Sequence, residues 1–125
     1  MKIEFTIPLT QQFMRSAANT SLHWTKKMKW VIRQRNILCI YYKKATYDIQ
    51  PILPCTVKMI RIAPRSLDYD NAVYSFKSYR DAISDELIPG FARGRADDDN
   101  RIKWEYGQEK GKPKEYAIRI EIECK

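Results

Sequence analysis

The sequence predicts an α/β domain of the α+β type, with a small mixed sheet and two main helices in the order β-α-β-α-β-β. Four short segments alternate apolar and polar residues or are rich in β-branched residues, which is typical of strands. Two longer segments repeat apolar residues every three or four positions, as helices do. With 125 residues and 44% hydrophobic content, the chain suits one domain spanning residues 1–125.

The first half of the chain predicts a strand, a helix and a second strand. Residues Lys2–Pro8 alternate apolar and polar side chains and end at a proline, which indicates a half-buried strand. Residues 10–22 show no period and are expected to form a loop. Residues 25–44 lack glycine and proline and have apolar side chains at helical spacing. Residues Cys55–Ala63 are rich in β-branched side chains and predict a strand, although their alternation is imperfect.

The second half predicts a helix followed by two strands. Asn71 is suited to cap a helix that begins at Ala72 and continues to about Leu87. Residues 101–106 and 116–124 alternate apolar and charged side chains, and the segment between them is rich in glycine, lysine and proline. We therefore expect the last two strands to form an antiparallel hairpin.

Composition restricts the class and location of the protein. No apolar run is long enough to span a membrane, and residues 1–5 lack a signal-peptide pattern, so a cytoplasmic protein is expected. Cys39, Cys55 and Cys124 are too widely spaced for a zinc site and are interpreted as reduced. The chain has no glycine-rich phosphate loop, so no nucleotide cofactor is expected.

The excess positive charge lies in the N-terminal third. Residues 1–44 contain nine Lys or Arg and one acid, Glu4, whereas the other 81 residues contain 14 bases and 14 acids. This balance accounts for the net charge of +8 and predicts a surface for a polyphosphate backbone. The residues expected to contact nucleic acid are Lys26, Lys27, Lys29 and Arg33, together with Arg93 and Arg95.

Two acidic runs indicate a candidate metal site. In an extended strand Asp68 and Asp70 would point to the same side, and two close carboxylates favour a hard divalent cation. Asp98 or Asp99 would supply a third ligand. The alternative interpretation is that Asp-Asn pairs cap helices and that the triple Asp is a solvated loop.

Three linked motifs resemble the RusA-like family of Holliday-junction resolvases from phages and prophages. The family pattern is Asp-x-Asp-Asn after a strand, Lys-x-x-x-Asp-Ala-apolar on a helix, and Asp-Asp-x-x-apolar before a strand. This chain has Asp68-Tyr69-Asp70-Asn71, then Lys77-Ser78-Tyr79-Arg80-Asp81-Ala82-Ile83, then Asp98-Asp99-Asn100-Arg101-Ile102. The order of elements agrees over nearly the full length, although the first 50 residues match only in character.

The resemblance implies a Mg²⁺-dependent endodeoxyribonuclease that acts as a homodimer and makes paired nicks across a four-way DNA junction. Mn²⁺ is a possible substitute ion. Asp68, Asp70 and Asp99 would be the essential carboxylates, with Asp98 as their neighbour and Lys77 assisting. This chain departs from the family because Lys77 follows Asn71 by six residues rather than three. The alternatives are a non-catalytic DNA-binding phage protein and a metal-dependent nuclease for flaps or other branched nucleic acid.

Overall fold

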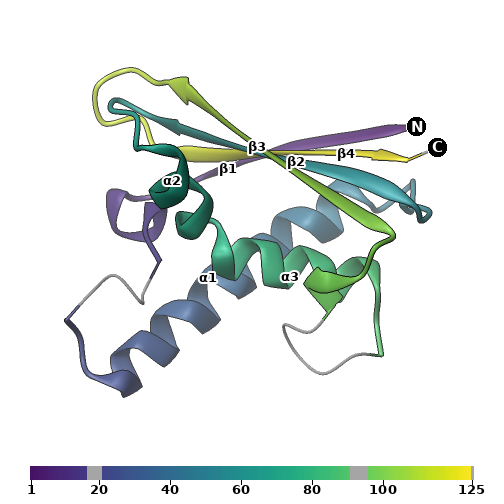
Figure 1. The fold of residues 1–125 in the computed structure, drawn as a ribbon, viewed down its shortest axis with the longest axis horizontal. Helices are drawn as coiled ribbons and strands as arrows, with labels where there is room; N and C mark the ends of the chain where they lie inside the picture. The colour runs from purple at the N-terminus through teal and green to yellow at the C-terminus, as the bar shows by residue number, and fades with distance from the viewer. Residues whose placement is uncertain (17–20, 91–95, 125) are drawn as a thin grey trace.

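A twisted four-stranded sheet carries its helices on one face, as Figure 1 shows. The structure, a computed structural model, describes residues 1–16, 21–90 and 96–124. Its elements are β1 (Lys2–Pro8), the 3-10 helix η1 (Gln11–Met14), α1 (Trp24–Ala45), β2 (Cys55–Ala63), α2 (Tyr69–Ser75), α3 (Lys77–Leu87), the 3-10 helix η3 (Ala96–Asp98), β3 (Ile102–Lys110) and β4 (Ala117–Cys124). The predicted α/β class with a mixed sheet is confirmed.

The strands lie in the order β1-β4-β2-β3. β4 is antiparallel to both of its neighbours, whereas β2 and β3 are parallel. The expected hairpin between the last two strands is therefore wrong, because β2 lies between them. The burial of each strand explains this order: β3 is mostly exposed and charged, which suits an edge, whereas β4 buries Ile118, Ile120, Ile122 and Cys124 and suits the interior of the sheet.

The hydrophobic core lies between the sheet and the two longer helices. Leu38 of α1 and Ile83 of α3 are fully buried against the isoleucine side chains of β4, including Ile120. Tyr79 of α3 is also fully buried, and its hydroxyl donates a hydrogen bond of 2.6 Å to the Phe13 carbonyl. These contacts hold η1 and both helices to one face of the sheet.

The three cysteines are free thiols, which agrees with the expectation from the sequence. Cys55 and Cys124 lie opposite each other in the β2–β4 register, and both are buried. Burial raises the pKa of the Cys55 thiol to about 11. Cys55 therefore stays protonated at neutral pH, and both side chains pack as small apolar groups.

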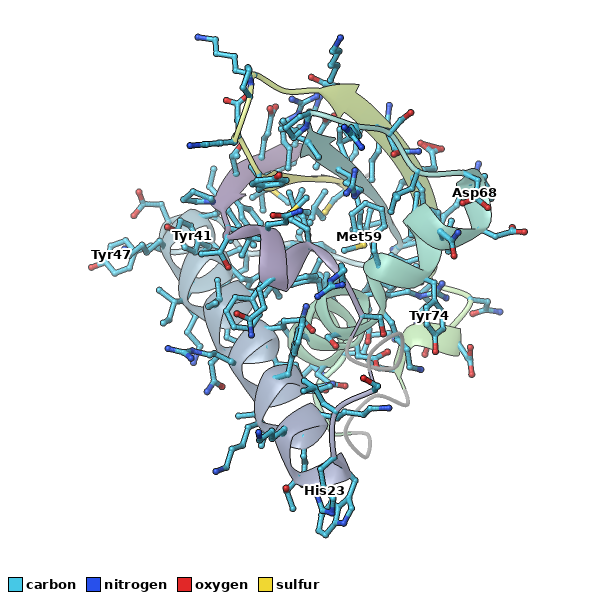
Figure 2. The ribbon with its side chains drawn as sticks, turned by 90° about the vertical axis from the view of Figure 1, so that its left-hand side faces the viewer. His23, Tyr41, Tyr47, Met59, Asp68 and Tyr74 are labelled. Carbon is cyan, nitrogen blue, oxygen red and sulfur yellow. The ribbon has the colours of Figure 1, made fainter. Side chains whose placement is uncertain are left out.

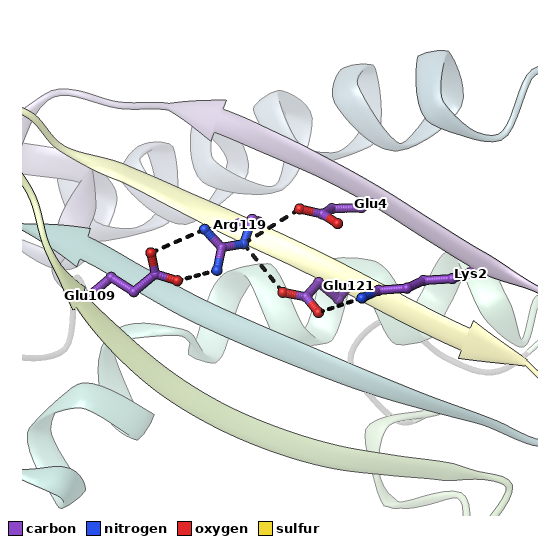
Figure 3. A network of polar contacts seen from close by, with 5 residues as sticks. All are labelled: Lys2, Glu4, Glu109, Arg119 and Glu121. Atoms are coloured by element: carbon purple, nitrogen blue, oxygen red, sulfur yellow. Dashed lines mark hydrogen bonds and ion pairs between the residues drawn. The ribbon is translucent and has the colours of Figure 1, made fainter.

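The other face of the sheet carries a network of charged side chains, drawn in Figure 3. Arg119 of β4 forms ion pairs with Glu109 of β3, with Glu121 at 3.2 Å and with Glu4 of β1 at 3.6 Å. Lys2 extends the network through Glu121 at 3.1 Å. The network therefore links three strands on a face that the helices leave uncovered.

The predicted helix over residues 72–87 is two helices in the structure. α2 begins at Tyr69 rather than at Ala72, and it ends at Ser75, whose hydroxyl donates to the Ala72 carbonyl at 2.6 Å. Such back-bonding bends helices. Phe76 then joins α2 to α3, is fully buried and stacks on Tyr106 of β3 with ring centroids 5.7 Å apart. Packing of Phe76 thus sets the change of direction visible in Figure 1.

Helix α1 begins at Trp24 and is capped by the preceding histidine. The Nδ1 atom of His23 accepts a hydrogen bond of 3.3 Å from the Thr25 backbone N–H. The helix then runs for 22 residues to Ala45. In the part of the chain that the structure describes, no helix is both long and apolar enough to cross a membrane.

The central position of β4 leads to a stability prediction. Ile120→Ala should lower the free energy of unfolding by about 2–5 kcal/mol, because it opens a cavity beneath α1 and α3. Ile52→Ala, at a side chain 66% exposed, should change it by less than about 0.5 kcal/mol. Urea denaturation followed by circular dichroism measures both values. Equal losses for the two variants would contradict the placement of β4 in the core.

Candidate functional site

The first acidic run forms the start of helix α2. Asp68 is the N-cap residue and Asp70 lies in the first turn, so neither belongs to an extended strand. Two residues correspond to about 200° of rotation on a helix, which turns the two carboxylates apart. Asn71 Nδ2 donates to Asp68 Oδ1 at 2.5 Å, whereas Asp70 lines a hollow on another side of the helix. The expectation that Asp68 and Asp70 lie on one face of an extended strand is therefore wrong, because α2 begins between them at Tyr69.

Gln108 positions the start of α2 against the sheet. Its side-chain Nε2 donates to the Leu67 carbonyl at 2.7 Å, and its Oε1 accepts from the Leu67 N–H at 2.8 Å. These two bonds join the segment before α2 to the far end of β3. Figure 2 shows the result, with Asp68 and Tyr74 on the outer side of α2 and far from His23 at the start of α1.

Asp70, Lys77 and Asp81 line one surface hollow of about 310 Å³. Arg80 lies in the same hollow, donates to the Tyr106 hydroxyl at 2.6 Å and stacks over the Trp104 ring at 4.8 Å. Lys77 is exposed and is the first residue of α3, directly after the break between the two helices. The hollow thus contains two carboxylates and two cations from adjacent helices.

Asp81 also has a structural role. Arg35 of α1 lies between Asp81, at 3.9 Å, and Asp85, and the Arg35 side chain is only 11% exposed. These half-buried ion pairs join α1 to α3. A charge from Arg35 therefore partly neutralises the Asp81 side of the hollow.

The second acidic run precedes β3. Asp98 lies in η3 and is exposed, and the side chain of Asp97 lies outside the described residues. Asp99 accepts two side-chain hydrogen bonds of 3.0 Å from Arg101 and a third of 3.0 Å from the Arg101 backbone N–H. The Arg101 guanidinium and this backbone bond lower the pKa of the Asp99 carboxyl to about 2. A cation that bound Asp99 would have to compete with Arg101.

The structure does not bring the two acidic runs together. Asp68 follows the segment held at Gln108, whereas Asp99 lies just before Ile102 at the other end of β3. Gln108 and Ile102 are six residues apart, or roughly 20 Å of extended strand. Among the described residues, no three His, Cys, Asp or Glu side chains are grouped as metal ligands. The predicted ligand set Asp68, Asp70 and Asp99 is thus not assembled.

The basic end of helix α1 forms a separate surface. Lys26, Lys29 and Arg33 are exposed and line a hollow of about 310 Å³ with Phe13 and Trp30. Arg33 stacks over the Phe13 ring at 5.7 Å. The remaining predicted contacts differ: Lys27 is only half-exposed, whereas Arg93 and Arg95 lie outside the described residues.

Sequence reasoning missed the cations that come from the sheet and from η1. Arg61 of β2 is buried and lines a pocket with Arg15 and Arg65. The sequence of β2 offered one signal for Arg61. Side chains alternate between the two faces of a strand, and this alternation places Arg61 on the same face as the apolar, inward-facing residues.

No protein-family model and no curated protein sequence match this chain. The resemblance to RusA-like resolvases therefore rests on the motif residues alone. Of these residues, Asp70, Lys77 and Asp81 line one hollow, whereas Asp68 and Asp99 lie elsewhere.

The Asp99–Arg101 pair leads to a pH prediction. The low pKa means that the pair stabilises the fold fully above the ordinary aspartate pKa of 3.8 and loses this effect as the pH falls through about 2. Arg101→Ala should raise the Asp99 pKa towards 3.8. Carboxyl NMR titration of both proteins measures this change. An unchanged pKa would show that the ion pair is absent in solution.

Proposed function

We propose that this protein binds branched DNA and cleaves it as a structure-selective endonuclease of the Holliday-junction-resolving type. One observation carries the proposal: Asp70, Lys77 and Asp81, which match two of the resolvase motifs, line the same hollow despite the break between α2 and α3. The exposed basic residues at the start of α1 add a surface that suits phosphate backbones.

The hollow contains groups suited to phosphodiester hydrolysis. Hydrolysis needs a positioned water molecule and neutralisation of the charge that develops on the phosphate. Lys77 is an exposed point charge that could contact a phosphate oxygen, and Asp70 is an exposed carboxylate beside it. Arg80 is anchored on the aromatic residues of β3 and adds a second cation.

Mg²⁺ is the cofactor that we propose, with Mn²⁺ as a substitute. This ion commonly uses one or two protein carboxylates and takes its other ligands from water and substrate phosphates. Asp70 and Asp81 are the carboxylates that line the hollow, so a set smaller than the predicted one fits this requirement. Bound there, Mg²⁺ would polarise the phosphate and lower the pKa of a bound water.

Further parts of the proposal follow from the resemblance. A symmetric homodimer would present two sites to opposed strands of a junction and so produce paired nicks. Such an enzyme would act in DNA recombination, DNA repair or phage DNA processing, in the cytoplasm of a bacterial host. Sedimentation of the protein alone and with a junction would test the dimer directly.

A non-catalytic DNA-binding protein is the second candidate. It is favoured by the ion pair between Asp99 and Arg101 and by the separation of the two acidic runs along β3. In that case Asp68 is a helix cap and Asp99 stabilises the turn before β3. DNA binding would then be independent of divalent cations.

The nuclease proposal is tested by Asp70→Asn. This substitution should lower Mg²⁺-dependent cleavage of a labelled four-way junction by at least about 100-fold, because it removes a charge that stabilises the reacting groups. Junction binding and the circular dichroism spectrum should be retained. Cleavage assays with Mg²⁺ and with EDTA, beside a linear duplex, provide the measurement.

Asp48→Asn is the matched control, because Asp48 is exposed and lies in the connector after α1. It should cleave as the wild type does. Tight junction binding without cleavage under Mg²⁺ or Mn²⁺ would support the DNA-binding protein instead. Equal cleavage activity of Asp70→Asn and Asp48→Asn would show that Asp70 is not part of the catalytic site.

The basic surface is tested by Lys26→Ala combined with Lys29→Ala. Loss of two phosphate contacts should weaken junction binding and reduce the slope of log affinity against log salt by up to about 1.8. Fluorescence anisotropy at increasing salt measures the slope. Lys43→Ala with Lys44→Ala, in the last turn of the same helix, makes the same charge change and should leave the slope unaltered.

A further inference from the structure

Arg61 is a charged residue on the core face of the sheet. It lies on β2 in the same alternation as Val57, Met59 and Ala63, all of which are buried. The strand register places it beside Ile118 of β4. An apolar side chain would be the ordinary occupant of such a position.

Within the part of the chain that the structure describes, the Arg61 guanidinium is buried without a counter-charge. The residue is 8% exposed, and its Nη1 donates to the Arg65 carbonyl at 2.8 Å. Its Nε atom has no hydrogen-bond partner, and no carboxylate pairs with it among the described residues. The segments 17–20 and 91–95 contain no acidic residue in their sequence. Burial accordingly lowers the pKa of Arg61.

Arg61 lines a pocket of about 520 Å³ between η1, α2 and the end of β2. Arg15 and Arg65 line the same pocket, so three arginine residues contribute to its walls. The hydroxyl of Tyr116 and the amide of Asn71 add neutral polar groups, and no Asp or Glu of the described chain lines the pocket. A buried cation without a counter-charge among further cations favours an anionic ligand.

The wall that carries Arg15 is firmly held. Gln34 of α1 is fully buried, and its Nε2 donates to the carbonyls of Phe13 at 3.1 Å and Arg15 at 2.9 Å. The Arg15 guanidinium also stacks over the Trp30 ring at 5.9 Å. The pocket is therefore organised before any ligand binds, which reduces the entropy lost on binding.

We propose that this arginine pocket, formed by Arg15, Arg61 and Arg65, binds a phosphate group of the DNA backbone. Guanidinium groups match the geometry of phosphate oxygens and stay charged when buried. Helix α2 separates the two concavities: Asn71 and Ser75 face the arginine pocket, whereas Asp70 and Tyr74 face the hollow that contains Lys77. A strand lying across α2 would reach both.

The inference that the phosphate belongs to DNA rests on the proposed function. The inference that the pocket binds an anion does not. Inorganic phosphate is therefore the first probe, titrated into the intact protein while ¹H–¹⁵N NMR spectra are recorded. The Arg61 Nε–H signal and the Asn71 and Ser75 amide signals should shift in a saturable manner. Sodium sulfate and sodium chloride at equal ionic strength distinguish anion binding from a general salt effect. A shift shared by chloride, or no saturable shift with phosphate, would overturn the site.

Arg61→Met keeps the length of the side chain and removes its charge. It should weaken phosphate binding by about tenfold or more, since charge-assisted hydrogen bonds are lost. Arg65→Ala is the second variant, because Arg65 is exposed and its replacement leaves the core intact. It should weaken binding by a smaller factor even if Arg61→Met does not fold. Lys43→Ala should bind phosphate as the wild type does, and equal binding by all three variants would overturn the proposal.

Junction binding then tests whether the ligand is DNA. Phosphate should compete with a labelled four-way junction, and Arg65→Ala should bind the junction more weakly than Lys43→Ala. Phosphate binding without any effect on junction affinity would overturn DNA as the ligand. Loss of cleavage in Asp70→Asn with normal phosphate shifts would support both proposals. Junction binding and cleavage unaffected by Arg65→Ala would overturn DNA as the ligand of the pocket and leave the nuclease proposal standing.

Discussion

The apolar face of the sheet is the constraint on which the rest of the structure depends. Ile118, Ile120 and Ile122 of β4 can leave water only if helices cover them, and the side chains of α1 and α3 provide that cover. The opposite face needs no cover, because the network around Arg119 keeps it polar. All helices therefore lie on one side, as Figure 1 shows. The pocket that Arg61 lines forms between η1, α2 and the end of β2.

Arg35 and Arg101 have carboxylate partners, whereas Arg61 has none among the described residues. Arg35 joins two helices through Asp81 and Asp85, and Arg101 holds Asp99 before β3. In both cases a carboxylate of the same chain neutralises the guanidinium charge, so folding alone accounts for the arginine. Arg61 is more deeply placed and has no such match among the described residues. Burial of an arginine without a counter-charge destabilises the free protein. Arg61 is therefore more readily explained by binding of an anionic ligand than by folding.

Local patterns in the sequence predicted individual strands better than the pairing of those strands in the sheet. The bounds of β1 and β2 were predicted correctly, because alternation and β-branched content act within one strand. The sheet order was not, because nothing local distinguishes a hairpin from a strand inserted between β1 and β2. The site shows the same limit. Asp70 was selected from its acidic run and Lys77 from the family resemblance, but the burial of Arg61 opposite Ile118 depends on the pairing of strands distant in the sequence.

The position of β4 also determines when the protein can fold. Ile3 of β1 pairs with Ile122 of β4, so the two ends of the sequence meet inside one sheet. β1 and β2 have no contact as neighbouring strands until residues 117–124 enter between them. Pairs so distant in sequence form slowly compared with local ones. During synthesis β1 therefore lacks its neighbouring strand until β4 has left the ribosome.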